Sequence, residues 1–201
     1  MNESPSHDRV IAETRAWLRH AVIGLNLCPF ARGVDSKGQV RYVVSDATEV
    51  EDLLAELCDE LQRLADADAA EVDTTLLMHP AVLQDFEDFN DFLELADAAV
   101  EELGLDGVLQ VASFHPQFQF ADTEPDDITN ATNRSPYPTL HLLREDSVDR
   151  AVAAFPEAEA IFERNMETLE QLGPVGFARV KAQWQADADA ELAGRTGGSD
   201  R

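Results

Sequence analysis

Three short apolar runs alternate with two long amphipathic segments between residues 39 and 114. The short runs cover Gln39 to Val44, Thr74 to Met78 and Gly107 to Phe114. The segments between them repeat leucine, valine and phenylalanine at the spacing of a helix that buries one face. The order strand, helix, strand, helix, strand predicts parallel strands joined by right-handed crossovers, with helices covering the sheet.

Further elements flank this unit on both sides. A fourth apolar run follows a long connection, and we expect it to add a strand that runs antiparallel to the others. The fold predicted is α/β, with a mainly parallel four-stranded sheet covered by helices. The flanking elements are expected at residues 8–23 (helix), 139–143 (strand), 148–155 (helix) and 157–172 (helix).

The extent of the folded region follows from the same pattern. We expect one α/β domain over residues 8–173, where Gly173 and Pro174 end the last predicted helix. From about Ala186 the chain is rich in alanine, aspartate and glycine. We therefore predict a disordered tail over residues 186–201 that can be removed without unfolding the domain.

Charge and composition restrict the partners of the chain. It has 15 Lys and Arg against 40 Asp and Glu, a formal net charge of -25 that repels nucleic acid. No apolar run is long enough to span a membrane, and the first residues lack the order of a signal peptide. Two cysteines are too few for a disulfide framework. We expect a cytoplasmic protein; its oligomeric state and any cofactor are left open.

Two strands end in the same dipeptide, His-Pro. His79 follows the second strand and His115 follows the third. If both strands run parallel in one sheet, both histidines reach the carboxyl edge, where open α/β folds place their ligands. The alternative is that each histidine only ends its strand and bonds a loop carbonyl.

The connection that follows His115 carries a polar group. It spans residues 116–138, which is unusually long, but its phenylalanines and Tyr137 indicate an ordered loop. Arg134, with amide side chains and a hydroxyl beside it, could bind a carboxylate or phosphate through two hydrogen bonds. The alternative is that these polar residues form turns before two prolines. The group comprises Asn130, Asn133, Arg134 and Ser135.

Cys28 is the third feature with chemical potential. Pro29 favours the first position of a helix, so Cys28 would cap a short helical turn whose dipole stabilises a thiolate. Arg32, Lys37 and Arg41 make this stretch a basic island in an acidic chain. The alternative is that Cys28 is a small buried residue at the junction of helix and strand.

Three segments resemble a known family. They are Gly24–Ala31 (GLNLCPFA), 113–116 (SFHP) and 130–138 (NATNRSPYP). Together they are similar to a bacterial and plastid family catalogued only as a domain of unknown function. The similarity extends to about Gly173 and implies a shared domain without naming an activity.

These residues are compatible with three alternative functions. The first is a thiol-dependent enzyme with Cys28 as nucleophile, His115 as general base or acid, and Asn133 with Arg134 orienting a small anionic substrate. The second is a metal-dependent enzyme that uses Cys28, His79 and His115 as ligands. The third is a module that binds a small anion and breaks no bond. The remaining residues expected around the substrate are Arg32, Lys37, His79, Asn130 and Ser135.

Overall fold

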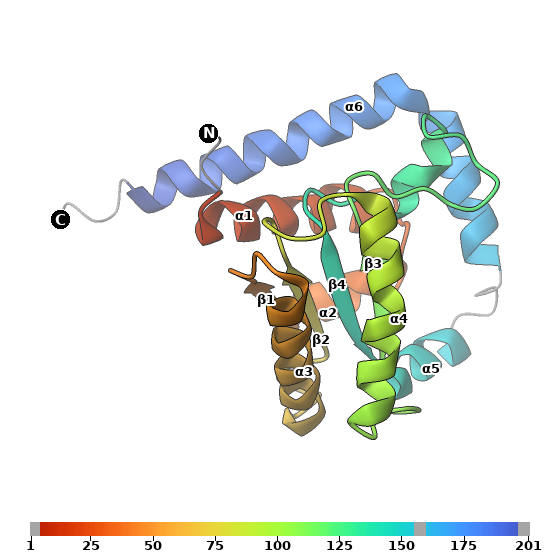
Figure 1. Cartoon of the computed structure of the whole chain (residues 1–201). Coiled ribbons are helices and arrows are strands. Elements are labelled where there is room, and N and C mark those ends of the chain that lie inside the picture. The colour runs from red at the N-terminus through yellow and green to blue at the C-terminus, as the bar shows by residue number, and fades with distance from the viewer. Residues whose placement is uncertain (1–4, 155–159, 197–201) are drawn as a thin grey trace.

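The computed structural model describes residues 5–154 and 160–196 (Figure 1). No helix within these residues is long and apolar enough to cross a membrane. The elements are α1 (His7–Trp17), the π-helix η1 (Leu18–Ile23), α2 (Ala31–Ser36), β1 (Val40–Val44), α3 (Val50–Asp66), β2 (Thr74–Met78), α4 (Phe86–Glu102), β3 (Leu109–Phe114), the 3-10 helix η2 (Ile128–Asn133), β4 (Thr139–Arg144), α5 (Glu145–Ala154) and α6 (Ile161–Thr196).

The sheet is mixed, with strand order β1-β2-β4-β3. β1 and β2 pair in parallel, whereas β4 pairs antiparallel with both β2 and β3. The antiparallel direction expected of β4 is confirmed, but the sheet is not mainly parallel, because β4 separates β3 from the other two. Burial explains the arrangement: Leu140 and Leu142 of β4 are fully buried, while Gln110 of β3 is exposed at the edge.

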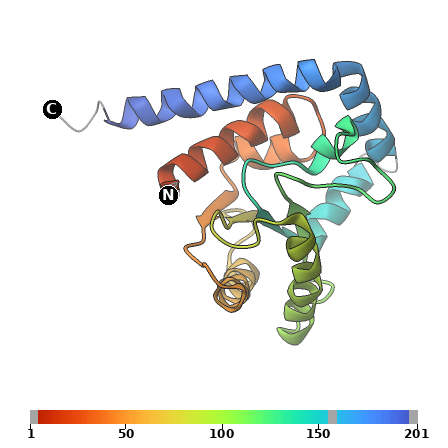
Figure 2. The same ribbon diagram turned by 45° about the horizontal axis from the view of Figure 1, so that its top comes forward.

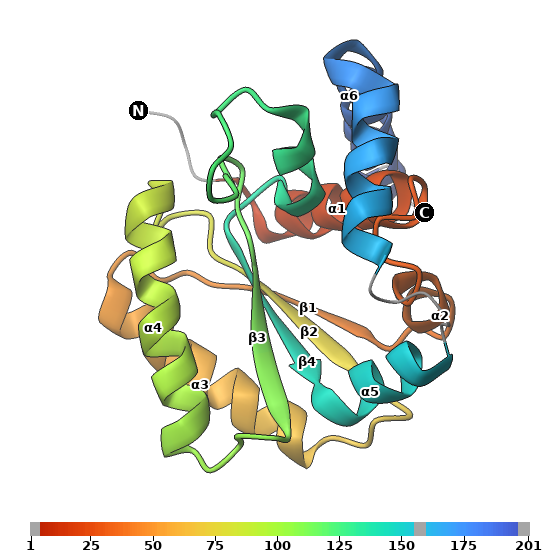
Figure 3. The same cartoon turned by 90° about the vertical axis from the view of Figure 1, so that its right-hand side faces the viewer.

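Helices cover both faces of the sheet (Figure 3). α3 and α4 pack on one face and form what we call the α3/α4 core. α1, η1 and the second half of α6 pack on the other face and form the α1/α6 core. The central residues of the α3/α4 core are Leu53, Leu57, Leu61, Leu77, Phe89, Leu140 and Leu142. Those of the α1/α6 core are Ala12, Ala16, Trp17, Trp184 and Ala188.

The last helix corrects the prediction of a disordered tail. Gly173, at φ 64° and ψ 172°, kinks α6, and Pro174 starts a second helical segment that continues to Thr196. This segment runs alongside α1 (Figure 2). Alanine favours helix and lets helices approach closely, so Ala188 is buried against α1 although the segment has little apolar surface. Residues 197–201 lie outside the described residues.

Charged pairs join the last helical segment to α1 and η1. Their members come from both ends of the chain, so α6 holds α1 by packing and by charge. Most of these pairs are partly exposed, and each contributes little by itself. The pairs are His20–Asp187 (2.6 Å), Arg15–Glu191 (2.7 Å), Arg195–Asp8 (3.0 Å) and Arg9–Asp189 (3.1 Å).

The other predicted helices match the structure in place. The helix expected at 8–23 is present as α1 followed by η1, and α5 lies where a helix was expected at 148–155. The adjoining ends of the helices expected at 148–155 and 157–172 fall partly on residues 155–159, which lie outside the described residues.

Deleting residues 186–201 should lower the melting temperature by about 5–10 °C. The deletion removes the apolar burial of Ala188 and of the partly buried Leu192, which we value at roughly 2–3 kcal/mol, and it removes all four of these ion pairs. Differential scanning calorimetry measures the change. A chain that ends at Thr196 keeps these contacts and is the control. Equal melting temperatures for the two truncated chains would restore the prediction of a dispensable tail.

Candidate functional site

The two His-Pro dipeptides lie at one edge of the sheet. Thr139 of β4 is the register partner of both Met78 and Phe114, the last residues of β2 and β3. His79 and His115 therefore leave the sheet at the same end, as the sequence predicted, and they lie on either side of β4. The backbone N–H of His79 donates to the carbonyl of Pro138 (3.0 Å), which extends the β2–β4 pairing by one bond.

His79 is fully buried and holds the loop between β2 and α4. Its Nδ1 donates to the carbonyl oxygen of Val82 (3.0 Å). Its Nε2 is buried and has no hydrogen-bond partner among the described residues. Burial lowers the pKa of His79 to about 4, because an imidazolium there would lose its hydration. At neutral pH this imidazole is uncharged.

His115 holds the next residue of the same loop. Its Nε2 donates to the carbonyl oxygen of Leu83 (3.3 Å), and its Nδ1 accepts the backbone N–H of Gln117 (3.0 Å). Burial also lowers the pKa of His115. Because both ring nitrogens are bonded, His115 has no lone pair left for a substrate proton unless one bond breaks. The role of His115 as a general base stays a prediction, and the two hydrogen bonds of its ring do not support it.

The aromatic ring of Phe89 completes this arrangement. It stacks between the two imidazoles, with ring centroids 5.6 Å from His79 and 5.1 Å from His115. The loop that they hold is strained, since Leu83 has φ 54°, a conformation unusual for a branched side chain. The two histidines therefore fix an unfavourable loop conformation at the N-terminal end of α4.

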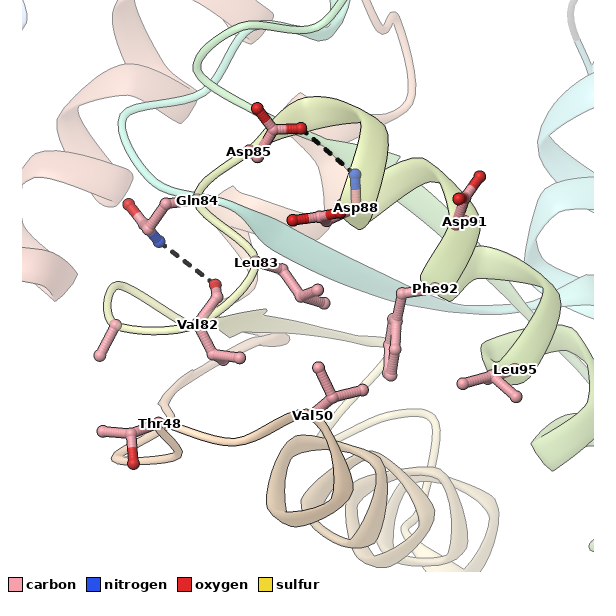
Figure 4. A pocket seen from close by; sticks show the side chains of 11 residues that line it. Thr48, Val50, Val82, Leu83, Gln84, Asp85, Asp88, Asp91, Phe92 and Leu95 are labelled. Atoms are coloured by element: carbon pink, nitrogen blue, oxygen red, sulfur yellow. Dashed lines mark hydrogen bonds between the residues drawn. The ribbon is translucent and has the colours of Figure 1, made fainter.

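A cleft of about 600 Å³ opens beside this loop, between α3 and α4 (Figure 4). Its apolar side chains include Val50 and Phe92, which lie across from each other. Its polar rim is acidic, with Asp85, Asp88 and Asp91 along α4. Asp85 already caps α4 by accepting the N–H groups of the first turn. Carboxylates at this rim repel an anion, so the cleft does not suit the anionic ligand expected from the sequence.

The long connection is ordered, as predicted, and its polar side chains bond the connection itself. Asn130 is fully buried and makes three hydrogen bonds to residues 120–124. The guanidinium of Arg134 donates to the carbonyls of Phe118 (3.0 Å) and Pro125 (2.7 Å), and burial lowers the pKa of Arg134. These bonds support the structural alternative for both side chains.

Asn133 and Ser135 also bond within this region. The side chain of Asn133 donates to the carbonyl of Ser113 in β3 (3.3 Å), and its own carbonyl accepts the backbone N–H of His115 (3.2 Å). Ser135 donates to the carbonyl of Tyr137 (2.6 Å). Two of the three segments that carry the family resemblance, 113–116 and 130–138, are thus joined directly.

The third segment contains Cys28, which lies on the opposite face of the sheet from His115. Its partly buried side chain packs against the α1/α6 core, together with Phe114. His115, one residue further, packs against Phe86 and Phe89 of α4. No hydrogen bond joins Cys28 to His115 in the described part of the chain. The two proposed catalytic residues are therefore not brought together as a pair.

The start of α2 and the basic island differ from expectation. The N-cap of α2 is Phe30 and not Cys28, whose carbonyl only accepts the N–H of Ala31 in the preceding turn (3.3 Å). Arg32 and Lys37 are exposed on α2 and its C-terminal cap. Arg41 lies on the other face, where Glu60 of α3 accepts two hydrogen bonds from it (2.8 and 3.0 Å). The island is therefore split between two faces.

A cavity of about 280 Å³ lies beside the residues that flank Cys28. Its walls are residues 24–30, which we call the Cys28 loop, and the first turns of α6. Asn26 has φ 56°, and the buried Asn165 donates to the carbonyl of Leu27 (2.9 Å), which holds the loop against α6. The polar lining residues are Asn26, Arg164, Asn165, Glu167, Thr168 and Gln171.

Sequence reasoning missed most of this cavity. Asn165 stands out as a polar residue on an apolar helical stripe, which is a visible signal. Arg164 and Thr168 carry no such signal, because exposed polar side chains are ordinary on a helix. Arg164 and Thr168 lie beside the Cys28 loop only because α6 packs against a segment that is far away in the sequence.

The metal alternative is not supported by the geometry. Within residues 5–154 and 160–196, no group of three or more His, Cys, Asp and Glu side chains is arranged to hold a metal ion. Cys28, His79 and His115 are all in this part of the chain, and the cysteine is on a different face from the histidines. The metal site considered from the sequence is therefore wrong for these three residues.

Comparison with known proteins finds one family. A family described as a protein of unknown function, DUF1415, matches residues 9–179. No curated protein and no solved structure matches the chain. The match covers α1 to the middle of α6 and includes all three segments of the resemblance.

Acidification should destabilise the protein through His79. The pKa of His79 in the folded protein is about 4, below the usual 6.5. Its contribution to the free energy of unfolding is therefore fully present above about pH 6.5 and is lost as the pH decreases towards 4. Between pH 7.5 and 5 the loss from this group is about 2 kcal/mol. Urea unfolding of the wild type and of His79→Asn, which can still donate to Val82, measures it. An equal loss in both proteins would contradict the assignment.

Proposed function

The chain belongs to the DUF1415 family, and we propose that it binds a small molecule with an acidic group in the polar cavity beside the Cys28 loop. The observation that carries the proposal is the cavity itself, which has a polar lining and a volume of about 280 Å³. That volume fits a small metabolite better than a macromolecule.

Charge supports an acidic ligand in this cavity. Ile161 and Arg164 lie in the first turn of α6, where the helix dipole and the guanidinium both attract negative charge. The side chains of Asn165 and Thr168 offer further hydrogen bonds. Glu167 on the same wall accepts hydrogen bonds, so it suits a hydroxyl or ammonium group elsewhere on the ligand. The best match is a small hydroxy acid or amino acid.

Catalysis by Cys28 is the second candidate function. Two residues that flank Cys28, Asn26 and Pro29, line the cavity, although Cys28 itself does not. As a residue, Cys28 is only partly buried. A thiol-dependent enzyme would bind its substrate in the cavity and use the thiol as nucleophile. On this proposal the electrophilic end of the substrate reaches past Pro29 towards the sheet.

Binding should be visible with inorganic phosphate and acetate as probes. We expect saturable shifts of the Asn26 and Asn165 amide signals when either anion is added to ¹⁵N-labelled protein. Arg164→Gln should weaken binding about tenfold or more, because it removes a charged hydrogen-bond donor. Arg179→Gln, an exposed arginine further along the same helix, is the matched control. Equal affinities of the two variants would reject the proposed site.

Cys28→Ser separates the two functions. A binding protein keeps its affinity for the probe anions in this variant, because the thiol is not part of the cavity wall. An enzyme of the thiol-dependent kind also keeps that affinity but loses turnover of its substrate. Loss of anion binding in Cys28→Ser, with the fold intact by circular dichroism, would show that neither account of the cavity is correct.

A further inference from the structure

The cleft between α3 and α4 shares no lining residue with the cavity beside the Cys28 loop. Its walls are the start of α3, the loop of residues 81–84 and the N-terminal part of α4. Its volume of about 600 Å³ is within the range of small-molecule sites. The two cavities can therefore hold different ligands.

One side of the cleft is apolar. Val50, the first residue of α3, lies across from Phe92 of α4, and Leu95 follows one turn later on the same helix (Figure 4). Phe92 is buried, whereas Leu95 is 47% exposed, so the apolar surface continues from the core to the solvent. An apolar group that enters the cleft can pack on these side chains and leave water.

The other side of the cleft is acidic. The carboxylates of Asp85, Asp88 and Asp91 lie along it (Figure 4). Among the lining residues that the structure describes there is no lysine, arginine or histidine. The sequence of α4 contains no basic residue, and Arg63 of α3 lies in the last turn of that helix, where it pairs with Glu60 (3.2 Å). The cleft itself therefore supplies no positive charge to balance its carboxylates.

The helix accounts for only part of this charge. Asp85 caps α4 by accepting the backbone N–H groups of Glu87 and Asp88 (2.9 and 3.4 Å). Asp88 lies in the first turn, where the helix dipole favours negative charge. Asp91 lies in the second turn, beyond the reach of the dipole, and its carboxylate repels that of Asp88 three residues before it. A cation between Asp88 and Asp91 removes this repulsion.

The remaining wall of the cleft is held in place by hydrogen bonds. Val82 and Leu83 line the cleft, and their carbonyl oxygens accept from His79 Nδ1 (3.0 Å) and His115 Nε2 (3.3 Å). The side-chain amide of Gln84 also donates to the carbonyl of Val82 (3.2 Å). A wall whose backbone is already fixed loses little conformational entropy on binding, which favours binding of a small ligand.

We propose that this cleft binds a small organic amine, with its ammonium group at Asp88 and Asp91 and an apolar body against Val50, Phe92 and Leu95. An exposed ion pair changes affinity by about fivefold at most, whereas each methylene group removed from water contributes about fourfold. An apolar body of several carbons therefore provides most of the affinity. The carboxylates select a cation and exclude an anion of the same shape.

Three probes of different charge and shape test the proposal. Phenethylamine is a cation with an aromatic ring at neutral pH, phenylacetate carries the same ring on an anion, and diaminobutane carries two positive charges without a ring. We expect phenethylamine to cause saturable shifts of the Val50, Gln84 and Phe92 amide signals in ¹⁵N-labelled protein, with a dissociation constant of about 1 mM. Phenylacetate should not shift these signals, and diaminobutane should bind about fivefold more weakly or worse.

Variants of the cleft are compared with a matched aspartate on the same helix. Asp88→Asn and Asp91→Asn should each weaken phenethylamine binding about two- to fivefold, because each removes one exposed ion pair. Leu95→Ala shortens the apolar wall and should weaken binding about fivefold. Asp97→Asn, outside the cleft, should leave the affinity unchanged. All four side chains are exposed, so the fold does not depend on them.

Three results would overturn the proposal. Equal affinities of Asp91→Asn and Asp97→Asn would mean that phenethylamine responds only to the overall negative charge. Binding of diaminobutane as tight as that of phenethylamine would mean that the apolar wall takes no part. A basic amphipathic peptide that shifts the three signals when phenethylamine does not would make the cleft a groove for peptides. None of these results bears on anion binding beside the Cys28 loop, so the two sites are tested separately.

Discussion

The structure depends on the insertion of β4 between β2 and β3. β4 pairs with both neighbours along its length, and Thr139 at its start meets the ends of both. This register sets His79 and His115 on either side of one strand, close enough to stack on Phe89. It also obliges the chain to return from the end of β3 to the same edge, through residues 116–138. Arg134 and Asn130 bond that long connection internally and keep it ordered.

The elements could be predicted from the sequence, but the strand order could not. Periodicity is local, and it marked each of the four strands and the helices α3 and α4 within a few residues. The pairing of strands is not local. The sequence pattern alone does not decide on which side of β3 an antiparallel β4 is added. Residues 186–196 were misjudged for a related reason. Their composition is poor in apolar groups, but small side chains pack well when the partner is the alanine-rich face of α1.

The candidate site shows the same limit at the level of single residues. The shared edge of His79 and His115 followed from the strand pattern, whereas their hydrogen-bond acceptors, Val82 and Leu83, belong to a loop whose path no pattern specifies. Cys28 belongs to the connection between α1 and β1. The face of the sheet on which Cys28 lies depends on the path of this connection, which no local pattern specifies.

The contact between α1 and α6 also orders events during synthesis. α1 leaves the ribosome before any strand, and the helical segment that packs on its Ala12 and Ala16 leaves after all of them. The sheet and the α3/α4 core can assemble in the meantime, because domains begin to fold as their chain emerges. The face of α1 turned towards α6 stays uncovered until then. In the nascent chain, this apolar surface of α1 is therefore available to chaperones for most of translation.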